Sequence, residues 1–360
     1  MEQKESTSGI LNLMIQPAFT VKNGVVDQVN APAKKYLLES GCPVADILLT
    51  GSCEYQEFSE GCLYVTLSLA GMHCSAAVHR MDGYDLFALE QDNDQAELQA
   101  MALAAQELRM PLSNVMTVAD QLFPVADESD DPAVKGQIAK INRGLFQMLR
   151  IVSNMSDAYR YSQHQEPKMT VEDISGLMNE IFEQATGLLI HGDVKLEFTN
   201  QEKAVFGLVD RERLERAVHN VISNAVKFSE KGSCIRARLA RRENMIYLTV
   251  RDGGSVRPEQ RGNIHTQFRR QPGLEDSRLG IGLGMVMIRS AASIHGGTVL
   301  ITYPEDGGTQ LTMSLDIRQN ADNMVRANAF HVDYAGERSH ALIELSDVLP
   351  LEAYESGLIN

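Results

Sequence analysis

The chain contains no apolar run that approaches the ~18 residues needed to cross a bilayer as a helix. Its first residues, MEQKESTSGI, lack the apolar core of a secretory signal peptide. Cysteine is scarce, with 5 in 360 residues, and no two cysteines have the two-residue gap typical of a zinc knuckle. These absences predict a cytoplasmic protein with no membrane span and no disulfide framework.

Basic residues are fewer than acidic ones. Lys and Arg number 33 against 48 Asp and Glu, which gives a net charge of −15. This balance argues against nucleic acid or an anionic membrane as a partner. Hydrophobic residues make up 44% and charged residues 22%, as in ordinary globular proteins. A chain of this length predicts two or three domains.

Four of the five cysteines lie in the first quarter of the chain, with two histidines nearby. The residues are Cys42, Cys53, Cys62, Cys74, His73 and His79. One interpretation is a metal or redox sensor. The other, which the lack of metal-ligand spacing favours, is that the cysteines are small apolar side chains.

Residues 1–91 have the pattern of a small antiparallel sheet with helices. In AFTVKNGVVDQVN two strand-like runs flank Asn23-Gly24, a strong signal for a two-residue hairpin. Later apolar runs are separated by Ala70-Gly71 and Asp82-Gly83, and APAKKYLLES predicts a short helix. This α+β unit resembles a PAS sensor domain, in strand order and in the phrase NGVVDQVNAPAKKYL.

Residues 92–165 change to helical periodicity and predict an α-helical hairpin. Apolar residues recur three and four apart in two stripes: Leu98, Met101, Ala105, Leu108, Leu112, Val115, Ala119 and Leu122, then Ile138, Ile141, Leu145, Met148, Ile151 and Met155. Pro124 and the acidic run that follows mark the turn between them. Because the stripes are too wide for one partner, we expect two hairpins to pair as a four-helix bundle in a homodimer.

Residues 166–318 alternate strand and helix patterns, which predicts an α/β sandwich. Residues 319–360 form a C-terminal extension. Within it AFHVDY and HALIELSDV alternate in a two-residue period, so we expect a terminal β-hairpin.

Three polar residues of HNVISNAVKF share one face of a predicted helix. Asn220 and Asn224 are four apart, and Lys227 follows one turn later. Two carboxamides can orient a hydrated magnesium ion, and a lysine can meet phosphates. Taken alone the pattern is weak, since such a face is more often simply solvated.

Further motifs strengthen the case for a nucleotide. In VRDGGSV, Asp252 follows a strand and can accept a hydrogen bond from an adenine amino group, while Gly254 permits close approach. LGIGLGMVMI is a glycine loop opening into a helix, where amides and the helix dipole favour phosphate. In GGTQLTMSL, Thr309 follows a turn and can add a polar contact near the base.

In this order, the motifs resemble the nucleotide-binding domain shared by histidine kinases, Hsp90-type chaperones and type II topoisomerases. The likeness spans residues 213–317 and includes Phe268 in HTQFRR. Upstream, AAQELRMPLSNV resembles the helix that carries the phosphoacceptor in histidine kinases. The whole chain therefore resembles a PAS-containing sensor histidine kinase, a multidomain protein with a histidine kinase-type ATP-binding domain.

The resemblance implies ATP and Mg²⁺ as cofactors and a response regulator as a possible partner. It assigns magnesium binding to Asn224 with support from Asn220, phosphate contact to Lys227, and adenine to Asp252. The mobile lid would include Gly280, Gly282, Leu283 and Gly284.

The acceptor helix departs from the family pattern. Gln106 stands where the phosphoacceptor histidine is expected, beside Glu107, and Met110 stands at the position of the phosphatase Thr or Asn. A carboxamide nitrogen is no nucleophile, because its lone pair is delocalised. His164 is the one histidine of residues 92–165 and could be a substitute acceptor. In the adenine loop, Val256 stands where the family has a second glycine.

The sequence therefore predicts a signalling protein that binds Mg-ATP without phosphorylating itself on the usual residue. Two alternatives stay open. One is an active kinase of a two-component system that uses a different acceptor. The other is a non-enzymatic scaffold that no longer binds ATP.

Overall fold

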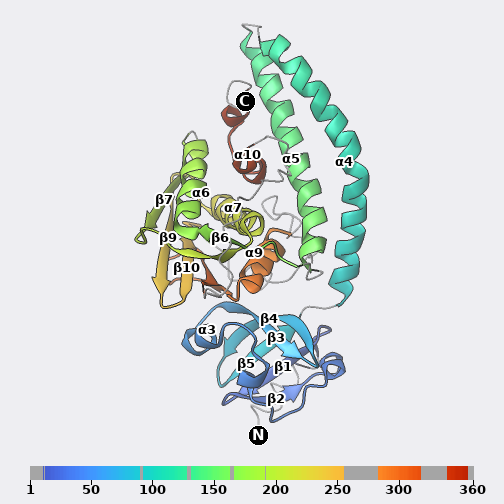
Figure 1. Cartoon of the computed structure of the whole chain (residues 1–360), viewed down its shortest axis with the longest axis vertical. Helices are drawn as coiled ribbons and strands as arrows, with labels where there is room; N and C mark the ends of the chain where they lie inside the picture. Colours follow the sequence, from blue (N-terminus) through green and yellow to red (C-terminus); the bar gives the residue numbers. More distant parts are fainter. Residues whose placement is uncertain are drawn as a thin grey trace.

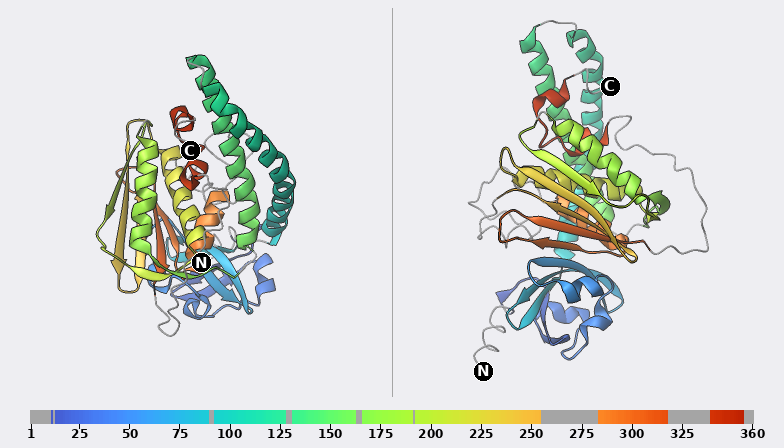
Figure 2. Two further views of the ribbon diagram at one scale, coloured as in Figure 1. Left: turned by 45° about the horizontal axis from the view of Figure 1, so that its top comes forward. Right: turned by 90° about the vertical axis from the view of Figure 1, so that its left-hand side faces the viewer.

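The computed structural model of the chain describes residues 11, 13–89, 92–127, 131–162, 166–190, 192–254, 283–317 and 339–355. They form an N-terminal sheet unit, two long helices, an α/β unit and a short C-terminal helical segment (Figure 1). The long helices stand beside the α/β unit and reach beyond it, and the N-terminal unit lies at the opposite end (Figures 1 and 2). Among the described helices, none has the length and apolar character to cross a membrane.

The N-terminal unit is an antiparallel sheet in the order β2-β1-β5-β4-β3. Its elements are β1 (Ala18–Lys22), β2 (Val25–Val29), η1 (Pro32–Tyr36), α2 (Val44–Ile47), α3 (Ser52–Glu57), β3 (Cys62–Leu69), β4 (Met72–Met81) and β5 (Tyr84–Leu89). The hairpin predicted at Asn23-Gly24 is confirmed, with both residues at positive φ as a two-residue turn of this kind requires. Phe19 and Phe87 stack at a centroid distance of 4.7 Å in the core of this unit.

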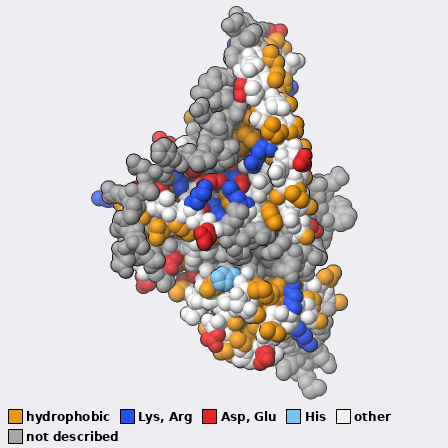
Figure 3. All heavy atoms as spheres, turned by 45° about the vertical axis from the view of Figure 1, so that its right-hand side comes forward, with side chains coloured by type: hydrophobic (Ala, Val, Ile, Leu, Met, Phe, Trp, Pro, Cys, Tyr) orange, Lys and Arg blue, Asp and Glu red, His pale blue; other side chains and the backbone are white. Residues whose placement is uncertain are grey.

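The helices α4 (Asp92–Asp127) and α5 (Pro132–Ser162) pack against each other along a buried seam. The seam consists of Ala105, Leu112, Met116, Ala119, Leu145 and Val152. A second set of large apolar side chains on these helices is exposed, and Figure 3 shows hydrophobic atoms along the projecting arm. The set is Leu103, Leu108, Met110, Val115, Val118, Leu122, Ile141, Met148 and Ile151. Three of the eight residues of the first predicted stripe and three of the six of the second are therefore exposed within one chain.

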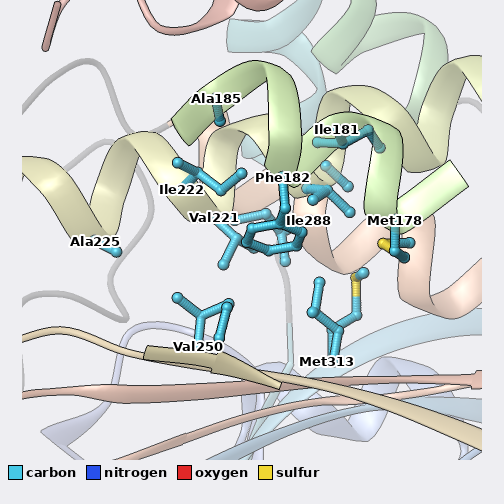
Figure 4. Close-up of a cluster of buried hydrophobic side chains, with 14 of the residues drawn as sticks. Met178, Ile181, Phe182, Ala185, Val221, Ile222, Ala225, Val250, Ile288 and Met313 are labelled. Atoms are coloured by element: carbon cyan, nitrogen blue, oxygen red, sulfur yellow. The ribbon is translucent and has the colours of Figure 1, made fainter. Parts of the chain in front are cut away.

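The α/β unit places helices on one face of a sheet. Its helices are α6 (Ile174–Leu189), α7 (Arg211–Phe228) and α9 (Leu283–Ile294), and its strands run in the order β11 (Val299–Thr302), β12 (Gln310–Asp316), β10 (Met245–Arg251), β9 (Cys234–Arg242) and β7 (Lys195–Asn200). β6 (Thr170–Asp173) and β8 (Phe206–Val209) form a separate antiparallel pair. In Figure 4, Phe182 of α6 and Val221 of α7 point toward Val250 and Met313 of the sheet. The predicted α/β sandwich is present.

The two sheets join into one, which the sequence did not predict. β3 of the N-terminal unit pairs antiparallel with β11, with Tyr64 opposite Val299 and Cys62 opposite Ile301. The result is a ten-stranded sheet that runs through both units. Two edge strands pair through backbone N–H and C=O groups, which nearly every residue has, so no pattern of side chains predicts this pairing.

The C-terminal hairpin prediction is wrong for the described residues. Residues 340–344 form α10 (His340–Glu344) and residues 351–354 form η2 (Leu351–Tyr354), where a strand was expected. Ser339 caps α10 by accepting a hydrogen bond from the Leu342 N–H at 3.4 Å. The helix is enclosed by α5, α6 and α7, so four successive residues, 341–344, are buried and no helical period is visible. The AFHVDY segment lies outside the described residues.

Candidate functional site

The start of α7 is fixed by two hydrogen bonds. Asp210 is the N-cap residue, and its Oδ1 accepts from the backbone N–H of Arg213 at 3.1 Å. The backbone N–H of Asp210 donates to Nε2 of His295 at 2.9 Å. These bonds attach the helix to the end of α9 and set the positions of the three polar residues further along it.

Asn220 and Asn224 lie in different environments, although they share a helix face. Asn220 is 1% exposed, and its amide nitrogen donates to the carbonyl of Arg216 at 2.9 Å. Its Oδ1 accepts from Nη2 of Arg150 at 3.4 Å. Asn224 is half-buried, and no residue in the described ranges forms a hydrogen bond with its carboxamide. Of the predicted magnesium pair, Asn224 is therefore the one that can turn its oxygen to a ligand.

Lys227 lies on the same face, at the C-terminal end of α7, and forms an ion pair with a carboxylate. Its Nζ lies 2.8 Å from Oδ2 of Asp347, in the turn after α10. Nη1 of Arg150, on α5, approaches the same oxygen at 2.5 Å. Two cations from separate helices thus converge on one carboxylate oxygen.

Asp252 lies at the end of β10 in a fixed orientation. Its Oδ1 accepts from the backbone N–H of Thr309 at 2.8 Å and from that of Gly254 at 3.0 Å. Burial raises the pKa of the Asp252 carboxyl, although these hydrogen bonds oppose the rise. The structure therefore brings together Asp252, Gly254 and Thr309, three of the residues that the sequence assigned to the nucleotide.

Two glycines allow this turn to pack tightly. A Cβ at Gly254 would lie 1.8 Å from the carbonyl oxygen of Phe228, at the end of α7. Gly308 has φ of +81°, and a Cβ there would lie 2.3 Å from the carbonyl oxygen of Asp252. Only glycine fits either position, so the Asp252 carboxylate is held against the end of the helix that carries Lys227.

The first turn of α9 approaches Asn220. A Cβ on Gly284 would lie 2.7 Å from Oδ1 of Asn220, and Leu283 is buried against Leu98 and Ala158. The start of a helix offers unpaired amides that favour phosphate. The other predicted nucleotide-contacting residues of this region, Phe268, Gly280 and Gly282, lie outside the described residues, as does Val256.

A cavity of about 370 Å³ opens beside Asp252, lined among others by Arg236, Arg251 and Asp306. Along β10 every second side chain is buried and faces the helices, and the side chains between them point to the other face of the sheet. Arg251 is one of the latter. The cavity thus lies on the sheet face away from α7. It is lined by Asp252 and Gly254 of the predicted nucleotide residues, but by none of those on α7.

The residues at the acceptor position lie apart from this group. Gln106, Glu107 and Met110 are exposed on α4, and Met110 has 69% of its surface open. Within the described part of the chain, no hydrogen bond or ion pair joins them to α7, Asp252 or Thr309. His164 lies outside the described residues.

The N-terminal cysteines show no arrangement for metal binding. Cys62 is buried, and burial raises the pKa of its thiol to about 12. None of the five cysteines, all of them described, forms a disulfide. Within the described part of the chain, no group of three or more His, Cys, Asp and Glu is placed to hold a metal ion.

Sequence reasoning missed Arg150 and Asp347, the residues that engage Lys227, and also the buried Glu344. Glu344 is 0% exposed and lies 3.0 Å from Nε of Arg216, which is itself fully buried. A signal was present on α5, where polar residues recur at helical spacing on a buried face. They are Asn142, Arg150, Asn154 and Asp157.

Comparison with known proteins places this site in a family. Residues 209–319 match the family described as histidine kinase-, DNA gyrase B- and HSP90-like ATPase. Hybrid signal transduction histidine kinase D of Dictyostelium discoideum is 26% identical over 245 residues, which cover 64% of this chain and 15% of that protein. Sensor histidine kinase RppB of Synechocystis is 24% identical, over 62% of this chain and 50% of its own length. The chain thus spans half or less of these relatives.

Solved structures give weaker likenesses. Full-length ShkA in complex with AMPPNP is 20% identical, covers 60% of this chain and 45% of its own, and has a TM-score of 0.47. The histidine kinase ThkA in complex with the response regulator TrrA is 14% identical, with coverage of 86% and 98% and a TM-score of 0.41. Residues 209–319 are therefore an ATPase domain of this type, and the chain is similar to sensor histidine kinases over 62% to 64% of its length.

Proposed function

We propose that the chain is a homodimeric signal-transduction protein that binds Mg-ATP and does not phosphorylate itself on α4. The Asp252 turn is the observation that carries the nucleotide part. Its carboxylate is oriented by Thr309 and Gly254 at 2.8 and 3.0 Å, and it is 8% exposed, so little water competes with a ligand for it. An adenine amino group has the donor that such a carboxylate recognises.

The remaining contacts would come from α7 and the start of α9. Asn224 has a carboxamide that can orient a hydrated Mg²⁺, and Lys227 carries a charge for a phosphate. Bound Mg²⁺ would neutralise phosphate charge. Asn220 would act indirectly, because its carboxamide already bonds Arg216 and Arg150 and can only support its neighbour.

The absence of self-phosphorylation rests on Gln106. The residue is exposed on α4, as an acceptor must be, but its amide lone pair is delocalised and cannot attack phosphorus. Met110, one turn further, has no group that could orient a water for dephosphorylation. We expect a response regulator, if one is bound, to receive no phosphate from this helix.

Dimerisation and sensing complete the proposal. The exposed apolar residues on α4 and α5 form a face that a second hairpin would cover as a four-helix bundle. The strand order β2-β1-β5-β4-β3, with helices between β2 and β3, supports a PAS-like sensor role for the N-terminal unit.

One observation favours a second candidate, a scaffold that does not bind ATP. Lys227 is paired with Asp347, and Asn220 bonds the guanidinium of Arg150 and the carbonyl of Arg216, so two of the predicted contacts are already satisfied within the chain. Binding of Mg-ATP separates the two functions.

Calorimetry of the full chain with Mg-ATP tests the proposal. Asp252→Asn removes the charge but keeps the shape, and should weaken binding by roughly 1–3 kcal/mol, or about 5- to 150-fold. Asp306→Asn is the matched control, since Asp306 is exposed in the neighbouring turn and its carboxylate pairs with Arg251. Absence of binding at millimolar Mg-ATP would establish the scaffold instead.

A further inference from the structure

The C-terminal segment, residues 339–355, is built into the space beside α5 and α7 (Figure 1). The ring of Tyr354 is fully buried and packs on Phe146 of α5 at a centroid distance of 5.4 Å. Asn142 donates from Nδ2 to the carbonyl of Tyr354 at 3.2 Å, and Gln147 donates to that of Ser346 at 3.2 Å. The segment is therefore specifically docked on both sides of the turn that carries Asp347.

The Asp347 side chain faces two cations and, unlike the fully buried Glu344 of the same segment, is partly exposed. Its Oδ2 lies 2.5 Å from Nη1 of Arg150 and 2.8 Å from Nζ of Lys227. The Asp347 side chain keeps 30% exposure, while those of Arg150 and Lys227 keep 7% and 18%. Burial raises the pKa of the Asp347 carboxyl, but the two cations outweigh it and hold the pKa below its usual value. The group is thus an anion at neutral pH.

The position of Arg150 connects this cluster to the nucleotide residues. Besides Asp347, its guanidinium donates from Nη2 to Oγ of Ser223 at 3.1 Å and reaches Oδ1 of Asn220 at 3.4 Å. A guanidinium and an ammonium that converge on one oxygen can bind a phosphate oxygen as well as a carboxylate oxygen, since both oxygens are negatively charged hydrogen-bond acceptors. One anion site therefore exists here, and the chain itself fills it.

We propose that Asp347 occupies the position of a nucleotide phosphate between Lys227 and Arg150, so that the C-terminal segment competes with Mg-ATP for this site. The inference rests on the proposed function, and it adds Arg150 of α5 as a phosphate-contacting residue. Nucleotide binding must displace the Asp347 carboxylate, and with it one of the links between α5 and α7. Occupancy of the site then alters how the ATPase domain is held on the helical hairpin.

Nucleotide affinity of the full chain, measured by calorimetry with Mg-ATP and with adenosine, tests the competition. Asp347→Asn should tighten Mg-ATP binding by about tenfold, because the bound state no longer requires expulsion of a competing group. Glu352→Gln is the matched control, because it removes the same charge from an exposed position in η2 and should change affinity less than about twofold. Adenosine has no phosphate, so its affinity should be equal in wild type and Asp347→Asn. Arg150→Gln placed in the Asp347→Asn background should reverse the gain for Mg-ATP.

The possible results separate the two proposals. Equal Mg-ATP affinity in wild type and Asp347→Asn would overturn the competition and leave nucleotide binding intact. An equal gain for adenosine would also overturn it, because the variant would then open the pocket without freeing a phosphate site. Binding by Asp347→Asn but not by wild type would support both proposals, and binding by neither would refute both. Hydrogen exchange of the unmodified chain tests the competition without any variant. The amides of residues 345–349 should exchange faster with Mg-ATP than with adenosine, and equal exchange would contradict the competition.

Discussion

The backbone N–H of Asp210 donates a hydrogen bond to Nε2 of His295 at 2.9 Å. On the other side of the ring, Nδ1 lies 2.7 Å from the carbonyl oxygen of Ala291 and therefore carries the proton. His295 is thus a neutral imidazole that connects the N-cap of α7 to the last turn of α9. Burial lowers its pKa, since a charged ring would lose solvation and its bond from Asp210.

This bond predicts that the fold loses stability in mild acid. In the unfolded chain a histidine titrates near pH 6.5, whereas folded His295 has a lowered pKa. Between these two values the unfolded state binds a proton that the folded state does not, so the free energy of unfolding falls as pH drops below about 6.5. The pKa values of His79 and His219 are lowered too, and these residues act in the same direction.

Urea unfolding at pH 7.5 and 5.5 measures the effect. His295→Asn should cost roughly 1–3 kcal/mol at pH 7.5 by leaving the Asp210 amide unsatisfied, and should reduce the loss between the two pH values. The exposed residue His73 provides the control, and His73→Asn should keep the wild-type pH dependence. A pH dependence unchanged in His295→Asn would contradict the assignment of the neutral ring.

The second prediction concerns the homodimer. Val115 is 53% exposed on α4, so Val115→Asp should leave the α4–α5 seam intact yet place a charge in the partner interface. We expect a shift from dimer to monomer by light scattering at tens of micromolar. Asn114→Asp, at the adjacent exposed position, should remain dimeric. Leu112 would be an uninformative site, because it is buried within the seam of a single chain. A monomeric wild-type protein would refute the prediction.

These cases show which features a sequence can predict. The Asn23-Gly24 hairpin and the periodicity of α4 and α5 are local, because their signals lie within a few residues of the structure they specify. The Asp252 turn was found for the same reason, since aspartate and glycine adjoin in the chain.

Features that depend on distant parts of the chain were missed. The sequence assigned polar residues of α7 to a nucleotide but did not predict that α5 and α10 cover part of this helix and bury Arg216, His219 and Asn220. From the sequence, Glu344 is expected at the surface, because charged residues are seldom buried without a partner. Its partner is Arg216, which is also buried. The residues that bury Arg216 of α7 lie far from it in the chain: Asn154 is 62 residues away and Glu344 is 128 residues away. A pattern within the helix cannot predict such burial.

The third prediction tests the junction of the two sheets. Gly61 and Gly71 both have positive φ, +90° and +77°, at the two ends of β3. A Cβ at Gly61 would lie 2.0 Å from the carbonyl oxygen of Ile301 in β11, whereas at Gly71 nothing lies within 4 Å. Gly71→Ala should cost about 1 kcal/mol from backbone strain alone. Gly61→Ala adds a clash that the backbone can relieve only by separating β3 from β11.

Hydrogen exchange and urea unfolding distinguish these variants. In Gly61→Ala the amides of residues 62–64 and 299–301 should lose protection, and the N-terminal unit should unfold in its own transition. Gly71→Ala should keep one transition with modestly lower stability. Identical behaviour of the two variants would mean that the ten-stranded sheet does not persist in solution.

The fourth prediction concerns phosphotransfer. The wild-type chain should form no acid-labile phosphohistidine with γ-labelled ATP, because Gln106 offers no nucleophilic nitrogen. Gln106→His restores an imidazole that is nucleophilic near pH 7, at an exposed position beside Glu107, which can take its proton. If the ATPase domain binds Mg-ATP and reaches α4, label should appear on this variant. Gln106→Asn is the control and should stay unlabelled.

The expected outcome depends on the docked C-terminal segment. While Asp347 holds Lys227 and Arg150, nucleotide enters poorly, so labelling of Gln106→His alone should be slow. Combination with Asp347→Asn should raise it, whereas combination with Asp252→Asn should abolish it by weakening adenine binding. Label on the wild-type chain would overturn the assignment of Gln106 as a lost acceptor, and its disappearance in His164→Ala would identify the substitute. No label on Gln106→His, in a protein that binds Mg-ATP, would mean that the ATPase domain does not reach α4 and that nucleotide acts only through the conformation of the chain.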